Sequence, residues 1–245
     1  MLPVIKKINE VLALPVGQFV TDSFEPYTTN VVKDIVKPGT VCYDVGANEG
    51  WYTTLFALLA GPNGLGGEVV AFEPMTGRAI EKLIGELKLN PQAAPIQLVE
   101  CALSDTYVGD VHVNRVRSDA WTLQHCAPGT NGGTDVHYTS MDALVEELGL
   151  PAPQVIKIDV DGDEPKVLRG AARTLQAHRP YIVLEVAPDF NQLQNEDIGQ
   201  ALRWLTDTLG YTLHADNDGR QLSPEDAIAA VCAWSSINVI CRPGG

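Results

Sequence analysis

The sequence predicts an α/β fold in which a parallel sheet of about seven strands carries helices on both faces. From Val41 onward, short runs rich in β-branched residues alternate with amphipathic helical stretches, the pattern of repeated strand–helix–strand units. The 245 residues, 45% of them hydrophobic and 20% charged, suffice for one large buried core. No linker, internal repeat or low-complexity tract divides the chain, so we expect a single domain over residues 1–245.

The first half of the sheet is expected to come from three runs, at residues 41–45, 68–72 and 96–100. A helix is predicted at 51–60, because its apolar residues share one face. A second helix is predicted at 76–89 by the spacing of its apolar residues, and Asn90-Pro91 ends it.

The second half should supply strands at 155–159, 181–186, 211–214 and 237–241. Helices are predicted at 141–148 and from Ile198 to Leu209, where Gly210 ends the helix. Another helix should follow the fourth strand, with Asp163 as its capping residue and Pro165 in its first turn. Glu164 in that turn would interact favourably with the helix dipole.

Two segments fall outside this alternation. Residues 1–30 are expected to form an N-terminal helical extension. Residues 106–140 are expected to form an insertion with short strands at 108–113 and 136–138 and a Gly-rich polar turn between them. We expect the insertion to form one wall of the ligand site.

The charge balance bears on partners and compartment. Seventeen Lys and Arg against 31 Asp and Glu give a net charge of −14, which repels phosphate backbones and anionic lipid, so we expect neither nucleic acid nor membrane as a partner. The five cysteines are widely spaced and form no C-x-x-C pair, which predicts reduced thiols in the cytoplasm. No apolar run approaches the ~18 residues of a membrane-spanning helix.

The stretch from Asp44 to Gly50 joins the first strand to the first helix, which is where an open α/β sheet forms its ligand crevice. Gly46 and Gly50 permit special backbone angles or close approach of a ligand, and Asp44 can accept hydrogen bonds. Asn48 stands where a dinucleotide-binding turn has a second glycine. Asp44 and Glu49 disfavour a pyrophosphate there, so a ligand without phosphate fits better.

Glu73 ends the second strand, where a carboxylate can accept hydrogen bonds from both hydroxyls of a ribose. A turn suited to an amino-acid group and an acid suited to a ribose together point to S-adenosylmethionine as the cofactor.

Two longer blocks, VCYDVGANEG at 41–50 and IKIDVDGDE at 156–164 followed by VLRG at 167–170, resemble the hallmark blocks of the FkbM family of S-adenosylmethionine-dependent methyltransferases. ALSD at 102–105 and SMDAL at 140–144 are similar to intermediate blocks of that family. The resemblance covers residues 31–187 and implies a Rossmann-like class I methyltransferase fold. It also implies methyl transfer, mostly to hydroxyl oxygens of small natural products or sugars.

Residue by residue, the resemblance implies cofactor binding by Asp44, Gly46, Asn48 and Glu73. Ser104 and Asp105 follow the third strand, where such folds contact adenine, and an Asp there can accept from the adenine amino group.

Asp159 and Glu185 lie at the ends of neighbouring strands and could hold a divalent cation together. Some sugar-modifying members of the family, and the similar catechol O-methyltransferases, bind Mg²⁺ with acids at these strand ends. Those enzymes have a further Asp or Asn after the second acid, whereas this chain has Val186. Magnesium and metal-independent proton abstraction therefore both remain open.

Candidate groups for proton abstraction lie on the fourth strand and in the insertion. Lys157 shares a strand face with Asp159 and is either its ion-pair partner or a cation that polarises a hydroxyl. His112, His125 and His137 lie in the insertion, and His137 is favoured as base because it precedes the return into the fourth strand.

Two other functions remain as alternatives. A nicotinamide-dependent oxidoreductase is disfavoured, because none of the tyrosines is followed four residues later by Lys. A non-catalytic module that binds a cofactor or a partner on the same fold stays open. The sequence does not identify the small-molecule or sugar acceptor, and it leaves open whether the chain forms a homo-oligomer.

Overall fold

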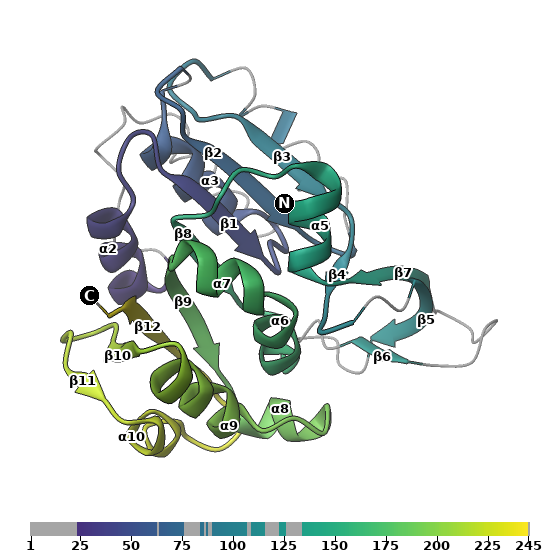
Figure 1. Ribbon diagram of the computed structural model, residues 1–245, viewed down its shortest axis with the longest axis vertical. Helices are drawn as coiled ribbons and strands as arrows, with labels where there is room; N and C mark the ends of the chain where they lie inside the picture. Colours follow the sequence, from purple (N-terminus) through teal and green to yellow (C-terminus); the bar gives the residue numbers. More distant parts are fainter. Residues whose placement is uncertain are drawn as a thin grey trace.

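The central sheet of the computed structural model has eight strands (Figure 1). The structure describes residues 24–62, 64–75, 84–85, 87, 90–106, 109–115, 123–125 and 134–244. In spatial order the strands are β11 (Gln221–Leu222), β10 (Tyr211–Ala215), β12 (Ile237–Pro243), β9 (Tyr181–Val186), β8 (Val155–Ile158), β1 (Val41–Val45), β2 (Glu68–Phe72) and β3 (Ile96–Val99).

The five strands from β9 to β3 are parallel, whereas β12 runs antiparallel to β9 and β10. The chain fills the sheet from β1 through β2 to β3 and then returns to add β8 on the other side of β1. Such a reversal opens a crevice at the carboxyl ends of the strands, here between β1 and β8.

Helices cover both faces of the sheet, as the sequence predicts. Along β1, Cys42 packs into one hydrophobic cluster while Tyr43 and Val45 pack into the other. The helices α2 (Pro26–Ile35) and α3 (Trp51–Ala60) lie on the Cys42 face. The opposite face is covered by α5 (Met141–Leu148), α6 (Glu164–Gly170), α7 (Ala172–His178) and α9 (Ile198–Arg203) (Figure 1).

Several expected elements have the predicted bounds: β1, β2, β9, α3 and α5. The helix expected from Ile198 to Leu209 is α-helical only to Arg203 and continues as a π-helical segment over Trp204–Thr208. The structure adds two short helices that the sequence does not predict, α8 (Pro188–Leu193) and α10 (Pro224–Ala229).

Beside the central sheet, the insertion and the short strand before it form a second, four-stranded sheet (Figure 1). Its order is β4 (Ala102–Leu103), β7 (Thr134–Thr139), β5 (Gly109–Arg115) and β6 (Leu123–His125). The predicted strands at 108–113 and 136–138 correspond to β5 and β7. Of the helical extension expected over residues 1–30, residues 1–23 lie outside the described residues, and α2 begins within the rest at Pro26. Most of the helix expected at 76–89 and the polar turn of the insertion also lie outside the described residues.

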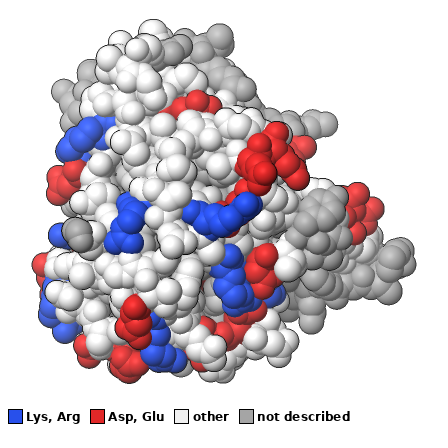
Figure 2. Space-filling model, in the orientation of Figure 1, with Lys and Arg blue, Asp and Glu red and all other residues white. Residues whose placement is uncertain are grey.

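Ion pairs join elements at the surface. Arg169 of α6 pairs with Asp105 after β4 and with Glu196 before α9. On the face shown in Figure 2, basic side chains are interspersed with acidic ones. No helix among the described residues combines the length and apolar character needed to cross a membrane.

Candidate active site

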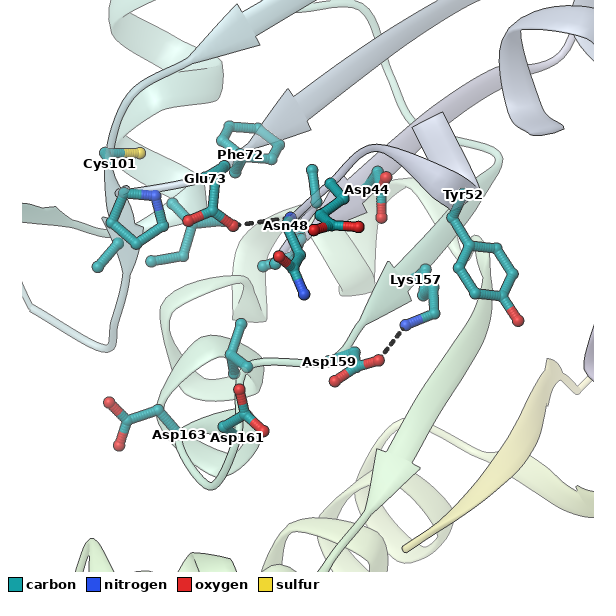
Figure 3. A pocket seen from close by; sticks show the side chains of 18 of the residues that line it. Asp44, Asn48, Tyr52, Phe72, Glu73, Cys101, Lys157, Asp159, Asp161 and Asp163 are labelled. Atoms are coloured by element: carbon teal, nitrogen blue, oxygen red, sulfur yellow. Dashed lines mark hydrogen bonds and ion pairs between the residues drawn. The ribbon is translucent and has the colours of Figure 1, made fainter. Parts of the chain in front are cut away.

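A pocket opens at the carboxyl ends of β1, β2 and β8 (Figure 3). Glu73 lies on one side of it, and Lys157, Asp159 and Tyr52 lie on the other. The glycine-rich turn after β1 passes between the two sides and contributes Asn48. The reversal point of the sheet thus brings together side chains from three strands.

The turn from Asp44 to Gly50 is shaped by backbone contacts on both sides. The amides of Gly46 and Ala47 donate to the carbonyl of Phe72 at the end of β2, at 3.0 and 3.1 Å. Gly46 has a φ of +82°, and a Cβ added to it would lie 1.8 Å from the carbonyl oxygen of Asp159. The missing side chain of Gly46 therefore makes room for the chain that follows β8, and the turn and the Asp159 loop fit directly together.

Glu73 is buried and oriented by two backbone amides. Its Oε2 accepts from the amide of Asn48 at 2.8 Å and its Oε1 from that of Met75 at 2.9 Å. Burial raises the pKa of Glu73 despite these two bonds. Each carboxylate oxygen offers about two acceptor positions, so both oxygens retain capacity toward a ligand in the pocket.

Asp44 is the deepest acid of the pocket. Its Oδ2 accepts a 2.6 Å hydrogen bond from the hydroxyl of Thr53 on α3. Burial raises the pKa of Asp44, while the Lys157 ammonium and the Thr53 hydroxyl oppose that rise. The parallel register places Lys157 directly beside Asp44.

Lys157 is buried and contacts Asp159, as expected for two residues on one strand face. Its Nζ lies 2.5 Å from Oδ2 of Asp159 and 4.5 Å from the ring centre of Tyr52. Burial alone would lower the pKa of Lys157, but the carboxylates of Asp159, Glu25 and Asp44 raise it above its ordinary value. Burial would raise the pKa of Asp159, but Lys157 holds it below its ordinary value. The pair is therefore an ammonium and a carboxylate at neutral pH.

Asp159 and Glu185 do meet, as the sequence predicts, but as hydrogen-bonded carboxyl groups. Burial and the neighbouring Asp159 raise the pKa of Glu185 well above its ordinary value. Asp159 is thus already paired with the Lys157 ammonium and hydrogen-bonded to Glu185. Across the described residues, no group of three or more His, Cys, Asp or Glu side chains is arranged to hold a metal ion. This donor set does not fit Mg²⁺.

Around the start of α6, the structure corrects the sequence interpretation. Asp163 occupies the capping position but makes no side-chain capping bond, because its carboxylate pairs with Lys166 at 2.7 Å. Glu164 lies in the first turn, as predicted, and is fully buried there. Its Oε1 accepts from the amides of Val160 and Gly162, and its Oε2 accepts from Nδ2 of Asn191 at 2.7 Å. Glu164 therefore fixes the loop that carries Asp161 along the pocket.

Ser104 and Asp105 are not among the residues that line the pocket. The Asp105 carboxylate accepts from Nε and Nη2 of Arg169, at 3.0 and 2.8 Å. Burial acts to raise the pKa of Asp105, but Arg169 holds it below its ordinary value. An adenine contact by these two residues stays a prediction, since the structure places their neighbours Cys101 to Leu103 in the pocket wall instead.

Among the insertion histidines, His112 and His137 are not among the residues that line the pocket. Tyr138 lines the pocket, and neighbouring side chains of a strand point to opposite faces, so His137 points to the other face of β7. Its Nδ1 lies 3.0 Å from Asp110 across the sheet, and that of His112 lies 2.7 Å from Asp135. The side chain of His125 lies outside the described residues.

Several pocket residues are not identified from the sequence as site residues: Phe24, Trp51, Tyr52, Cys101, Tyr138 and Gln194. The apolar pattern of residues 51–60 predicts only that Tyr52 belongs to the buried face of a helix. No sequence signal indicates more, because only the fold shows that its ring lies against Lys157.

The model of the methyltransferase FkbM domain matches residues 44–213 of this chain. A curated relative, the hexuronic acid methyltransferase AglP of Haloferax volcanii, is 37% identical over 57 residues, which are 23% of this chain and 23% of the relative. Among solved structures, the methyltransferase FkbM from Methylobacillus flagellatus KT is 14% identical with a TM-score of 0.49. The alignment covers 98% of this chain and 58% of that one.

The cofactor-bound protein Rv0187 from MTB is 12% identical with a TM-score of 0.50, over 98% of this chain and 88% of that one. This likeness concerns the fold alone. The chain spans 23% of the length of AglP and 58% of that of the Methylobacillus protein.

Proposed function

Because the chain belongs to the methyltransferase FkbM family, we propose that it transfers a methyl group from S-adenosylmethionine to a hydroxyl oxygen of a small natural product or sugar. The observation that carries this proposal is the Lys157–Asp159 ion pair, which lines the same pocket as the glycine turn and Glu73. The name of the AglP relative, a hexuronic acid methyltransferase, supports a sugar as the acceptor.

The residues of the pocket fit this cofactor. The Glu73 oxygens keep acceptor capacity for two ribose hydroxyls. Asp44 and the turn of Gly46 and Asn48 form an acidic part of the pocket that suits the amino-acid end of a cofactor without phosphate groups. The bound cofactor supplies a methyl group on a positively charged sulfur, which is already activated for displacement.

Asp159 then serves as the acceptor's hydrogen-bond partner and base. As the new O–CH₃ bond forms and the S–CH₃ bond breaks, the hydroxyl proton becomes strongly acidic, so a carboxylate of low pKa can take it. Lys157 keeps Asp159 ionised until that moment, and the proton passes from Asp159 to solvent afterwards. Holding the hydroxyl in line with the methyl carbon accounts for much of the remaining rate enhancement.

We also propose the cytoplasm as the compartment and a small molecule, not nucleic acid or lipid, as the partner. The net charge of −14 supports the second point. The four cysteines that the structure describes are free thiols, three of them buried, which supports a reducing compartment.

Calorimetric titration with S-adenosylhomocysteine, with NADH as the comparison ligand, tests the cofactor. We expect binding of the first and none of the second. Glu73→Ala should weaken S-adenosylhomocysteine binding by about 1–3 kcal/mol, because it removes a charged acceptor of two hydroxyls. Glu146→Ala, on the exposed side of α5, is the control and should bind normally. Equal affinity of both variants would remove Glu73 from the cofactor site.

Asp159→Asn tests the base. Turnover should fall about 10²–10⁴-fold, while the affinity for S-adenosylhomocysteine stays within about threefold, because the carboxamide cannot take the proton. The matched control is Asp163→Asn, another pocket acid paired with a lysine, and it should retain turnover. Parallel loss of cofactor affinity in Asp159→Asn would reassign this residue to cofactor binding.

A further inference from the structure

Phe24 forms part of the pocket wall although it lies outside the matched residues 44–213. Phe24 is 38% exposed at this wall of the pocket. Its ring centre lies 5.6 Å from that of Trp51 and 6.5 Å from that of Tyr52. One aromatic surface therefore combines the segment before α2 with the start of α3.

This segment is held in place by specific bonds. Glu25 Oε2 accepts from the Tyr52 hydroxyl at 2.6 Å and from Nδ2 of Asn238 on β12 at 2.8 Å. The hydroxyl of Thr29 donates to the carbonyl of Phe24 at 2.9 Å. Glu25 itself adopts a left-handed φ of +42°, a conformation that surrounding contacts must maintain. Phe24 is thus presented to the pocket by a fixed backbone.

The aromatic surface belongs to the acceptor side of the pocket. Tyr52 contacts both Phe24 and the Lys157 ammonium, and Lys157 contacts Asp159. Glu73, the proposed ribose partner, lies on the opposite side of the pocket (Figure 3). The Phe24 ring thus adjoins the side of the pocket where Tyr52 contacts the ammonium that pairs with the proposed base.

We propose that Phe24 is a specificity-determining residue that stacks against the pyranose ring of a glycoside acceptor, an inference that rests on the proposed function. A pyranose has apolar C–H faces and a polar rim of hydroxyls. The exposed Phe24 ring suits such a face, while Asp159, Asp161 and Lys157 supply charged partners for the hydroxyls at the rim. An acyclic polyol offers the same hydroxyls but no ring face, so Phe24 should distinguish the two.

The test uses the full chain saturated with S-adenosylhomocysteine. Binding of methyl α-D-glucopyranoside, methyl α-D-mannopyranoside and methyl α-D-glucuronopyranoside is measured by saturation-transfer difference NMR and titration, with D-sorbitol as the acyclic control. Phe24→Ala is compared with Phe24→Tyr and with Tyr27→Ala. Tyr27 is a suitable control because it is an exposed aromatic residue on α2, 59% accessible, that does not line the pocket.

We expect at least one glycoside to bind, and sorbitol not to bind. Phe24→Ala should weaken the glycoside roughly fivefold or more, whereas Phe24→Tyr and Tyr27→Ala stay within about twofold. S-adenosylhomocysteine affinity should be unchanged in all three variants, which also reports that they fold.

Three results would overturn the inference: unchanged glycoside affinity in Phe24→Ala, an equal loss of cofactor affinity in that variant, or no glycoside binding to the saturated wild-type protein. Failure of the proposed function looks different, because the wild-type protein would then not bind S-adenosylhomocysteine at all.

Discussion

Glu164 is a carboxyl group in a fully buried setting that nevertheless offers it three hydrogen-bond donors. Burial raises the pKa of Glu164 from 4.5 to about 7, even though the backbone donors oppose the shift. A carboxyl group whose pKa is raised in the folded state contributes its full stabilisation at pH values below its ordinary pKa. That contribution is lost as the pH rises through about 7.

We therefore expect Glu164→Gln to change how stability depends on pH. The difference between the two pKa values corresponds to about 3 kcal/mol between the fully protonated and fully ionised limits. Relative to the variant, the wild-type protein should lose unfolding free energy by that order between pH 5 and pH 8. Urea unfolding across this range measures it, with Glu146→Gln on the exposed surface as the control. A constant difference between wild type and variant would show that Glu164 does not titrate there.

Individual site residues were predictable where they end strands. Asp44, Glu73 and Asp159 could be assigned to one pocket because the carboxyl ends of neighbouring parallel strands meet at one edge. The buried hydrogen bonds of Glu164 and Glu185 could not be predicted, since they depend on neighbours that only the folded chain supplies. His137 failed to reach the pocket for a similar reason, because the alternation along β7 turned its neighbour inward instead.

The turn after β1 and the loop after β8 are two elements that interlock through Gly46. Its φ of +82° and the Asp159 carbonyl beside its Cα both exclude a side chain. Gly149 at the end of α5 also has a left-handed φ, of +62°, but a Cβ added there would meet no atom within 4 Å. A substitution at Gly149 therefore measures the backbone strain alone, without steric crowding.

We expect Gly149→Ala to cost about 1–2 kcal/mol of unfolding free energy, the penalty for a left-handed residue with a side chain. Gly46→Ala should cost roughly 3 kcal/mol or more, because the Asp159 loop must also move. Chemical unfolding of both variants gives the comparison. Equal losses would mean that the turn can shift away from β8 without difficulty.

Elements that are mostly apolar runs were predicted to the residue, as α3 and β9 show. The helices α8 and α10 each span six residues, too few for an apolar repeat to appear. For α10 a usable signal exists, since Ser223 and Asp226 form a capping box and Pro224 occupies the first turn. The start of α8 carries only Pro188 and Asp189, which suit a turn equally well.

On the scale of the whole molecule, the pocket draws on the N-terminal segment, both halves of the central sheet and the insertion. A ligand that binds there binds only the folded chain and therefore stabilises it. At a concentration one hundred times its Kd, S-adenosylhomocysteine should add about 2.7 kcal/mol.

For a domain of this size that gain corresponds to a rise in Tm of about 5–10 °C. Thermal unfolding with increasing S-adenosylhomocysteine should show a logarithmic dependence on ligand concentration, and NADH at the same concentrations should leave the Tm unchanged. An equal rise with both ligands would contradict selective binding.

The order of the strands also determines when the pocket can exist during synthesis. Cys42 of β1 pairs with Val155 of β8, so one edge of β1 has no partner until residues more than a hundred positions later have been made. Pairing over such a distance makes folding slow and leaves a nascent chain with an open strand edge. Insertion of β8 closes that edge and, in the same step, places Lys157 and Asp159 beside the glycine turn. A ribosome-bound chain should therefore gain its ligand-binding capacity abruptly and late.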